Sequence, residues 1–169
     1  DSSLSLDPKP LAAAEGLTPP RETRTVLLTG ASGWLGRFLC LEWLEKLAPL
    51  DGKVICLIRA PDDATARRRL EEVYGEADPV LTARFRELAA GHLEVIAADL
   101  AEPRLGLAPE LYERLAAEVD HIVHPAAFVN HKLSYRSLFE PNVAGTAELI
   151  RLALTSRMKR FDFVSSTAV

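Results

Sequence analysis

Continuous apolar runs, rather than alternating patterns, mark the strands that this sequence predicts. Thr25–Thr29 (TVLLT) and Lys53–Ile58 (KVICLI) have the composition of strands that are buried on both faces. Three further short segments with the content of strands lie at Leu93–Ala97, Val119–Val123 and Arg160–Ser165. Strands of this kind are typical of a parallel sheet that is covered on both sides.

The segments between the strands have the spacing of amphipathic helices. Trp34–Leu47 carries apolar residues at helical intervals, which places them on one face of a helix. Further helices are predicted at Ala64–Val73, Val80–Ala90, Pro109–Ala117 and from about Glu140 to Ser156. Pro109 occupies a position that proline favours, because a helix does not need the amide hydrogen of its first residue.

The alternation of strands and helices predicts the fold class. Successive parallel strands are joined by right-handed crossovers, so the helices cover both faces of the sheet. We therefore expect an α/β fold, with a Rossmann-type doubly wound parallel sheet of five strands in a domain over residues 24–169. Residues 1–23 contain Pro19-Pro20 and little periodicity, and are expected to form a partly disordered linker.

Composition and charge narrow the classes of function. The 169-residue chain has a net charge of -4, which argues against a nucleic-acid partner. Its apolar runs are far shorter than the ~20 residues that span a bilayer, so no membrane partner is expected. The polar N-terminus does not resemble a signal peptide, which favours a cytoplasmic location.

The cysteines and histidines do not indicate a metal site. Cys40 and Cys56 each lie in an apolar stretch and are interpreted as buried thiols. His121 and His124 are three residues apart on a predicted strand, so they point to opposite faces and cannot share a metal. His131 is interpreted as a loop histidine without a role rather than as a residue that lines the substrate side.

A glycine-rich segment between the first strand and the first helix carries the clearest chemistry. The run from Thr29 to Gly36 reads TGASGWLG. Gly30 allows the sharp turn, Gly33 lets the backbone approach a pyrophosphate, and Gly36 lets the helix pack closely on the sheet. The anion is then expected at the helix N-terminus, with Ser32, Trp34 and Leu35 among the residues around the cofactor.

The end of the second strand indicates which nicotinamide cofactor is bound. A carboxylate at this point accepts from the ribose 2′-hydroxyl of NAD, whereas a basic residue accommodates the 2′-phosphate of NADP. The strand ends in Arg59, with no carboxylate before Asp62, which favours NADPH. Arg67, Arg68 and Arg69 reach the same edge; Arg69 is included among the binding residues, although which member contacts the phosphate stays open.

The G-x-x-G-x-x-G spacing resembles the extended branch of the short-chain dehydrogenase/reductase superfamily. The resemblance implies that Asp99 hydrogen-bonds the adenine and that Leu100 packs on its ring. It also implies that the small residues Pro125, Ala126 and Ala127 let the backbone lie beside the cofactor. Asn142, in an NVxGT element, is expected to support the backbone after the fourth strand, and Ser166 aligns with the catalytic serine or threonine.

Several segments together resemble a narrower family. TVLLTGASGWLGRFLCLEWLEKL, VICLIRAPDDATARRRLEEVY, HLEVIAADL, IVHPAAFVNH, PNVAGTAELIRLAL and FVSST are similar to the thioester reductase domain of carboxylic acid reductases. The terminal reductase domains of nonribosomal peptide synthetases are close relatives of that domain. The resemblance implies two partners in the parent chain: an adenylation domain, and a carrier domain whose phosphopantetheine delivers an acyl thioester.

The family reaction is reduction of that thioester to an aldehyde by NADPH, with Ser166 hydrogen-bonding the developing oxyanion. The family also uses a Tyr-x-x-x-Lys pair, which is absent here, since none of Tyr74, Tyr112 and Tyr135 has a lysine four residues later. We therefore expect a fragment that stops after strand five, lacks the C-terminal substrate subdomain and is inactive alone. Two alternatives stay open: an NAD-dependent extended short-chain dehydrogenase such as a sugar-nucleotide epimerase, and a non-catalytic NADP-sensing module.

Overall fold

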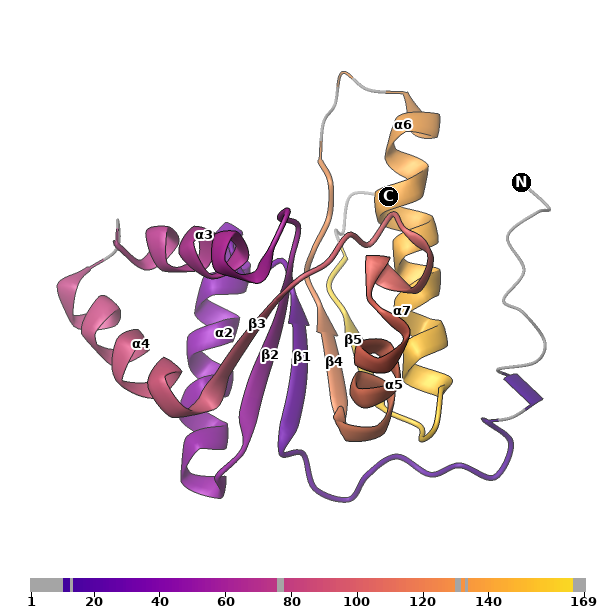
Figure 1. Cartoon of the computed structure of the whole chain (residues 1–169), viewed down its shortest axis with the longest axis horizontal. Helices are drawn as coiled ribbons and strands as arrows, with labels where there is room; N and C mark the ends of the chain where they lie inside the picture. Colours follow the sequence, from indigo (N-terminus) through magenta and orange to yellow (C-terminus); the bar gives the residue numbers. More distant parts are fainter. Residues whose placement is uncertain (1–10, 13, 76–77, 130–131, 133, 166–169) are drawn as a thin grey trace.

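The computed structural model describes residues 11–12, 14–75, 78–129, 132 and 134–165 (Figure 1). Within these ranges a five-stranded, all-parallel sheet has the order β3-β2-β1-β4-β5. Its strands are β1 (Thr25–Thr29), β2 (Lys53–Ile58), β3 (Leu93–Ala97), β4 (His121–His124) and β5 (Arg160–Phe163). The predicted fold class, a Rossmann-type doubly wound α/β sheet, is confirmed.

Helices cover both faces of the sheet (Figure 1). One face is covered by α2 (Trp34–Leu47), α3 (Asp63–Gly75) and α4 (Pro79–His92), and the other by α5 (Pro109–Glu118) and α7 (Gly145–Leu154). Further helical elements are α6 (Tyr135–Phe139), two short 3₁₀ turns, Ala48–Leu50 and Pro103–Gly106, and a π-helical segment, Glu140–Ala144. No helix among the described residues combines the length and apolarity needed to cross a membrane.

The central strand β1 explains why the sheet has two separate apolar cores. Its residues Val26 to Thr29 have no exposed surface, and successive side chains point to opposite faces. Leu28 joins the cluster beneath α2, α3 and α4, whereas Leu27 joins the cluster beneath α5 and α7. This double burial is the reason for the continuous apolar sequence of the strand.

The boundaries of the last elements differ from the sequence prediction. The predicted strand at Val119–Val123 instead begins at His121, because Val119 terminates α5 and its amide donates to the Leu115 carbonyl. The helix predicted from Glu140 begins earlier, at Tyr135, because Ser134 caps it by accepting from the Ser137 amide.

The long helix is also not a regular α-helix throughout. It passes through the π-helical segment Glu140–Ala144 before α7 begins. Pro141 in that segment has no amide hydrogen and its ring clashes with a preceding carbonyl, so the regular hydrogen-bond ladder is interrupted there. The C-terminal ends of two elements also differ from the prediction. The helix ends at Leu154 rather than at Ser156, and β5 ends at Phe163 rather than at Ser165.

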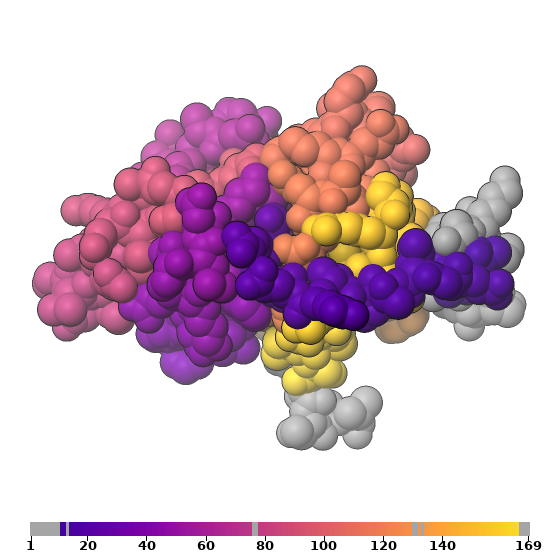
Figure 2. Space-filling view, turned by 90° about the horizontal axis from the view of Figure 1, so that it is seen from below, coloured from indigo at the N-terminus to yellow at the C-terminus, as the bar shows by residue number. Residues whose placement is uncertain are grey.

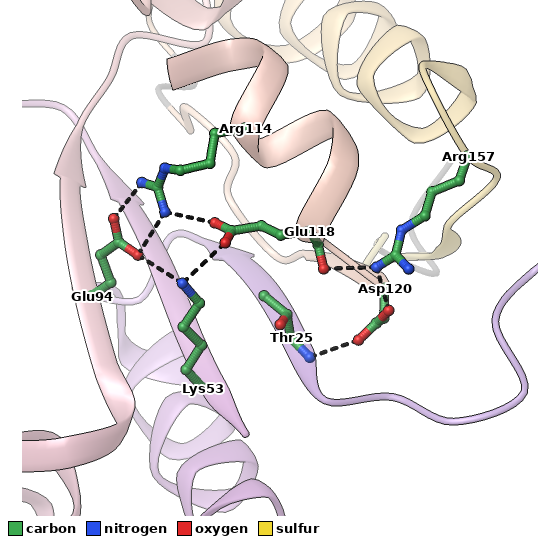
Figure 3. A network of polar contacts seen from close by, with 7 residues as sticks. All are labelled: Thr25, Lys53, Glu94, Arg114, Glu118, Asp120 and Arg157. Carbon is green, nitrogen blue, oxygen red and sulfur yellow. Dashed lines mark hydrogen bonds and ion pairs between the residues drawn. The ribbon is translucent and has the colours of Figure 1, made fainter. Parts of the chain in front are cut away.

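A polar network joins the amino ends of the strands (Figure 3). The buried Asp120 carboxylate accepts from the amides of Arg24 and Thr25, each at 2.8 Å, and from the Arg157 guanidinium. Beside it, Lys53 bridges Glu94 and Glu118, with both nitrogen–oxygen distances at 3.2 Å. Arg114 pairs with the same two glutamates.

The segment that leads into β1 crosses this amino-end face of the molecule, where Figure 2 shows it in indigo. Asp120 holds the end of that segment, since its carboxylate accepts from the amide of Arg24, which precedes β1, and from the amide of Thr25, which begins it. The network therefore fixes the point at which the chain enters the sheet.

Replacing Asp120 should test this anchor. We expect Asp120→Ala to lower the free energy of unfolding by about 3 kcal/mol, because two backbone amides and a guanidinium lose a buried acceptor. Glu42→Gln is the control: it removes an exposed pair with Lys46 and should cost no more than about 0.5 kcal/mol. Urea unfolding of both variants measures the difference, and equal losses would contradict the role of Asp120.

Candidate functional site

A cavity of about 330 Å³ lies at the carboxyl ends of the strands. It is placed where the strand order reverses, between β1 and β4, the point at which doubly wound sheets bind ligands. Many of the predicted cofactor-binding residues line it: Gly30, Ser32, Gly33, Arg59, Asp99, Leu100, Pro125, Ala126 and Ala127. The fold thus brings residues from four separate loops to one cavity.

Five lining residues were not singled out from the sequence: Leu57, Ile58, Ala98, Phe128 and Pro141. The first three directly precede Arg59 and Asp99, so the ends of the strands already indicated them. Phe128 directly follows the predicted run of small residues. Pro141 comes from the π-helical segment, and no local sequence signal connects it with the cavity.

Close backbone contacts explain the glycines of the loop after β1. Gly30 adopts a φ of +63°, and a Cβ there would lie 2.9 Å from the backbone of Ala126. A Cβ on Gly36 would lie 1.9 Å from the Gly30 carbonyl oxygen. The Gly33 amide donates to the same oxygen at 2.9 Å. Side chains at Gly30 or Gly36 would therefore separate elements that now touch.

The N-terminus of α2 offers amide groups rather than side chains. Gly33 is the N-cap and provides no side-chain cap, so the first amides of the helix lack the usual local acceptor. The helix dipole adds partial positive charge at this end, which favours an anion. The side chains of Trp34 and Leu35 are 76% and 41% exposed, and neither they nor Gly36 line the cavity.

Arg59 is exposed at the mouth of the cavity. Its guanidinium carbon lies 5.9 Å from the centre of the Phe128 ring, which comes from the opposite side. Among the three arginines of α3, Arg69 donates to the Arg59 carbonyl. Arg67 and Arg68 instead pair with glutamates one turn along the helix, so Arg69 is the member held beside Arg59.

Asp99 and Leu100 form the wall of the cavity after β3. The Asp99 carboxylate accepts from the Ala101 amide at 3.0 Å, and the backbone amide of Asp99 donates to the Leu105 carbonyl. Leu100 is packed closely by α7, because a Cβ on Gly145 would lie 2.9 Å from the Leu100 side chain and carbonyl oxygen. The glycine of the NVxGT element therefore brings α7 against this wall.

Asn142 holds the segment that follows β4. Its side-chain oxygen accepts from the Phe128 amide at 2.7 Å, and its side-chain nitrogen donates to the Phe128 carbonyl at 2.9 Å. The expectation that Asn142 supports the backbone after the fourth strand is confirmed.

His124, the last residue of β4, is 1% exposed. Its Nδ1 lies 2.7 Å from the Thr29 hydroxyl and its Nε2 lies 3.1 Å from the Thr146 hydroxyl. Burial lowers the pKa of His124 from its ordinary value to about 4, so the ring is neutral near pH 7.

The predicted opposite orientation of the two strand histidines is confirmed. His121 contacts Trp43 of α2, with 5.3 Å between ring centres, whereas His124 contacts α7 on the other face. No cluster of three or more His, Cys, Asp or Glu side chains suited to a metal ion occurs in the described ranges. The predicted catalytic residue Ser166 and the loop residue His131 lie outside the described residues.

The sequence and the fold match those of known reductases. Residues 28–169 match the family model described as Male sterility protein. The chain is 52% identical over 165 residues to a carboxylic acid reductase from Segniliparus rugosus, covering 97% of this chain and 14% of that protein. It is 54% identical over 165 residues to an isonitrile lipopeptide synthase from Mycobacterium tuberculosis, covering 97% of this chain and 6% of that protein.

A solved structure supports the same relationship. The reductase domain of a nonribosomal peptide synthetase from Mycobacterium tuberculosis has a TM-score of 0.86 and 53% identity to the chain. The match covers 95% of this chain and 37% of that one. The chain therefore spans only a small part of the length of the curated relatives and less than half of the solved domain.

Two glycine-to-alanine substitutions should have opposite effects on stability. We expect Gly36→Ala to destabilise the protein by at least about 3 kcal/mol, because its Cβ meets a backbone carbonyl that cannot move aside. Gly91→Ala, in α4, meets no atom within 4 Å and should stabilise by up to about 1 kcal/mol. Thermal denaturation compares them, and a well-folded Gly36→Ala protein would refute the close packing of α2.

Proposed function

The chain belongs to the Male sterility protein family, and we propose that it holds NADPH for the reduction of a carrier-bound acyl thioester to an aldehyde. The observation that carries this proposal is the cavity at the strand-order reversal, bordered by an uncapped helix N-terminus and by Arg59. The carboxylic acid reductase and the reductase domain of a nonribosomal peptide synthetase, to each of which the chain is more than half identical, support the reaction class.

The lining residues fit a dinucleotide. Gly30 and Gly33 line the cavity without a side chain, which lets a pyrophosphate approach the backbone there. The free amides at the start of α2 would bind the phosphate oxygens. Asp99 and Leu100 would take the adenine, while the small residues 125–127 leave space along the ribose.

Arg59 supports the choice of NADPH over NADH. Its guanidinium matches the geometry of a phosphate, and it stands at the mouth of the cavity beside Asp99 and opposite Phe128. Arg69, which is tied to the Arg59 backbone, would add a second positive charge near the same point. A ribose-binding carboxylate would be needed at this strand end for NAD, and Arg59 takes that place.

The cofactor would supply a hydride to the thioester carbonyl carbon. Ser166 is proposed to stabilise the oxyanion that forms on the carbonyl oxygen. Departure of the thiolate and its protonation then give an aldehyde and the free thiol of the phosphopantetheine arm. We propose that this arm belongs to a carrier domain, which an adenylation domain of the same multidomain protein loads.

The reaction is tested with the full-length reductase polypeptide and an acylated carrier domain. We expect NADPH loss, free thiol and aldehyde to appear in equal amounts. A sugar-nucleotide epimerase would instead act with NAD and release no thiol, and a sensing module would bind NADPH without consuming it. Either of those results would refute the proposed reaction.

Arg59→Ala should separate the two nicotinamide cofactors. We expect the dissociation constant for NADPH to rise by about tenfold or more, since a charge-assisted contact to the 2′-phosphate is lost, while that for NADH changes little. Arg68→Ala is the matched control, because Arg68 is exposed and lies 3.9 Å from Glu72 on the same helix. Fluorescence titration measures both constants, and equal effects on the two cofactors would overturn the assignment.

A further inference from the structure

A series of hydrogen bonds runs through His124, from the amide of the cavity-lining Ala126 to the Asn142 carbonyl. We infer that His124 is a positioning residue, a neutral imidazole protonated on Nε2, which fixes the cavity-lining backbone at Ala126 against the glycine loop. This inference rests on the proposed cofactor site, because its consequence is cofactor affinity. It assigns a role to a histidine that does not itself line the cavity.

The hydrogen-bond partners determine the direction of every bond on the Nε2 side. The Thr146 hydroxyl donates to the Asn142 carbonyl at 2.6 Å, so its single hydrogen is used there. Thr146 can then only accept from His124, which requires the imidazole hydrogen to be on Nε2, 3.1 Å away.

The Nδ1 side follows from that result. A neutral imidazole with its hydrogen on Nε2 has an acceptor at Nδ1, so the Thr29 hydroxyl donates to it at 2.7 Å. The Thr29 oxygen is left to accept from the Ala126 amide, at 3.4 Å. Each hydrogen bond in this series, from the Ala126 amide to the Asn142 carbonyl, thus has an assigned donor and acceptor.

The position of these hydrogen bonds explains how they affect the shape of the cavity. Ala126 is the residue whose backbone comes close to Gly30, and it lines the cavity. Two residues further, Asn142 holds Phe128 by two bonds. His124, acting through Thr29, and Asn142 therefore hold the segment 125–128 at Ala126 and at Phe128.

The surroundings of His124 favour the neutral ring. It lies against the hydroxyls of Thr29 and Thr146 and the rings of Phe161 and Phe163, with ring centres 6.4 and 5.4 Å away, and none of these four groups is charged. A second proton on Nδ1 would face the Thr29 oxygen and displace the hydrogen now donated to the ring. Burial, which lowers the pKa of His124, acts in the same direction.

The tautomer is measured first, on the protein without cofactor. Long-range proton–nitrogen NMR spectra distinguish a protonated Nε2 from a protonated Nδ1. We expect His124 to show a hydrogen on Nε2 alone and no titration between about pH 5 and 8, where an ordinary histidine changes charge. A hydrogen on Nδ1, or a titration within that range, would overturn the inference even if NADPH binds normally.

Cofactor binding by variants is measured second, after thermal denaturation has shown that they are folded. We expect His124→Phe, which keeps a ring but loses both nitrogens, to raise the NADPH dissociation constant by about tenfold. His124→Asn keeps an acceptor near the place of Nδ1 and should recover part of this loss. His121→Phe is the matched control on the other face of the same strand and should bind NADPH like the unchanged protein.

The two proposals fail in different ways. If the unchanged protein does not bind NADPH, the proposed function is wrong, whereas the tautomer result still stands. If the unchanged protein binds NADPH and His124→Phe binds it equally well, the positioning role of His124 is wrong.

Discussion

The structure depends on one point of backbone contact, at Gly30. Its carbonyl lies under the first turn of α2, where only glycine fits at position 36, and its own α-carbon faces the backbone of Ala126. The loop after β1, the first turn of α2 and the distant segment after β4 therefore meet without a side chain between them. The placement of the helix end, and with it the direction of its dipole, follows from this contact.

Sequence reasoning succeeded wherever the signal was local. The first three strands have the predicted limits, because each is a buried apolar run that a turn or a helix end bounds. It failed by two residues at β4, where the apolar Val119 terminates α5 instead of entering the sheet. The π-helical segment was not predicted, since helical periodicity shows only that the stretch is amphipathic and does not reveal how Pro141 is accommodated.

The candidate site shows the same division. The motif residues that line the cavity fall in short runs directly after the strands and were found from those local patterns, whereas Phe128 meets Arg59 only after folding. The strand histidines were considered from the sequence only as metal ligands. The contacts of His124 are to Thr29 and Thr146, 95 and 22 residues away, and no spacing rule predicts such contacts.

The polar network of Lys53, Glu94, Arg114 and Glu118 lies at the opposite end of the strands from the cavity. Because these charges are partly exposed, changes among them can alter the heat tolerance of the protein in small steps. The length of the sheet separates such changes from the ligand. A protein engineer, or natural selection, can therefore adjust thermal stability at the amino ends of the strands and ligand binding at their carboxyl ends with little conflict between the two.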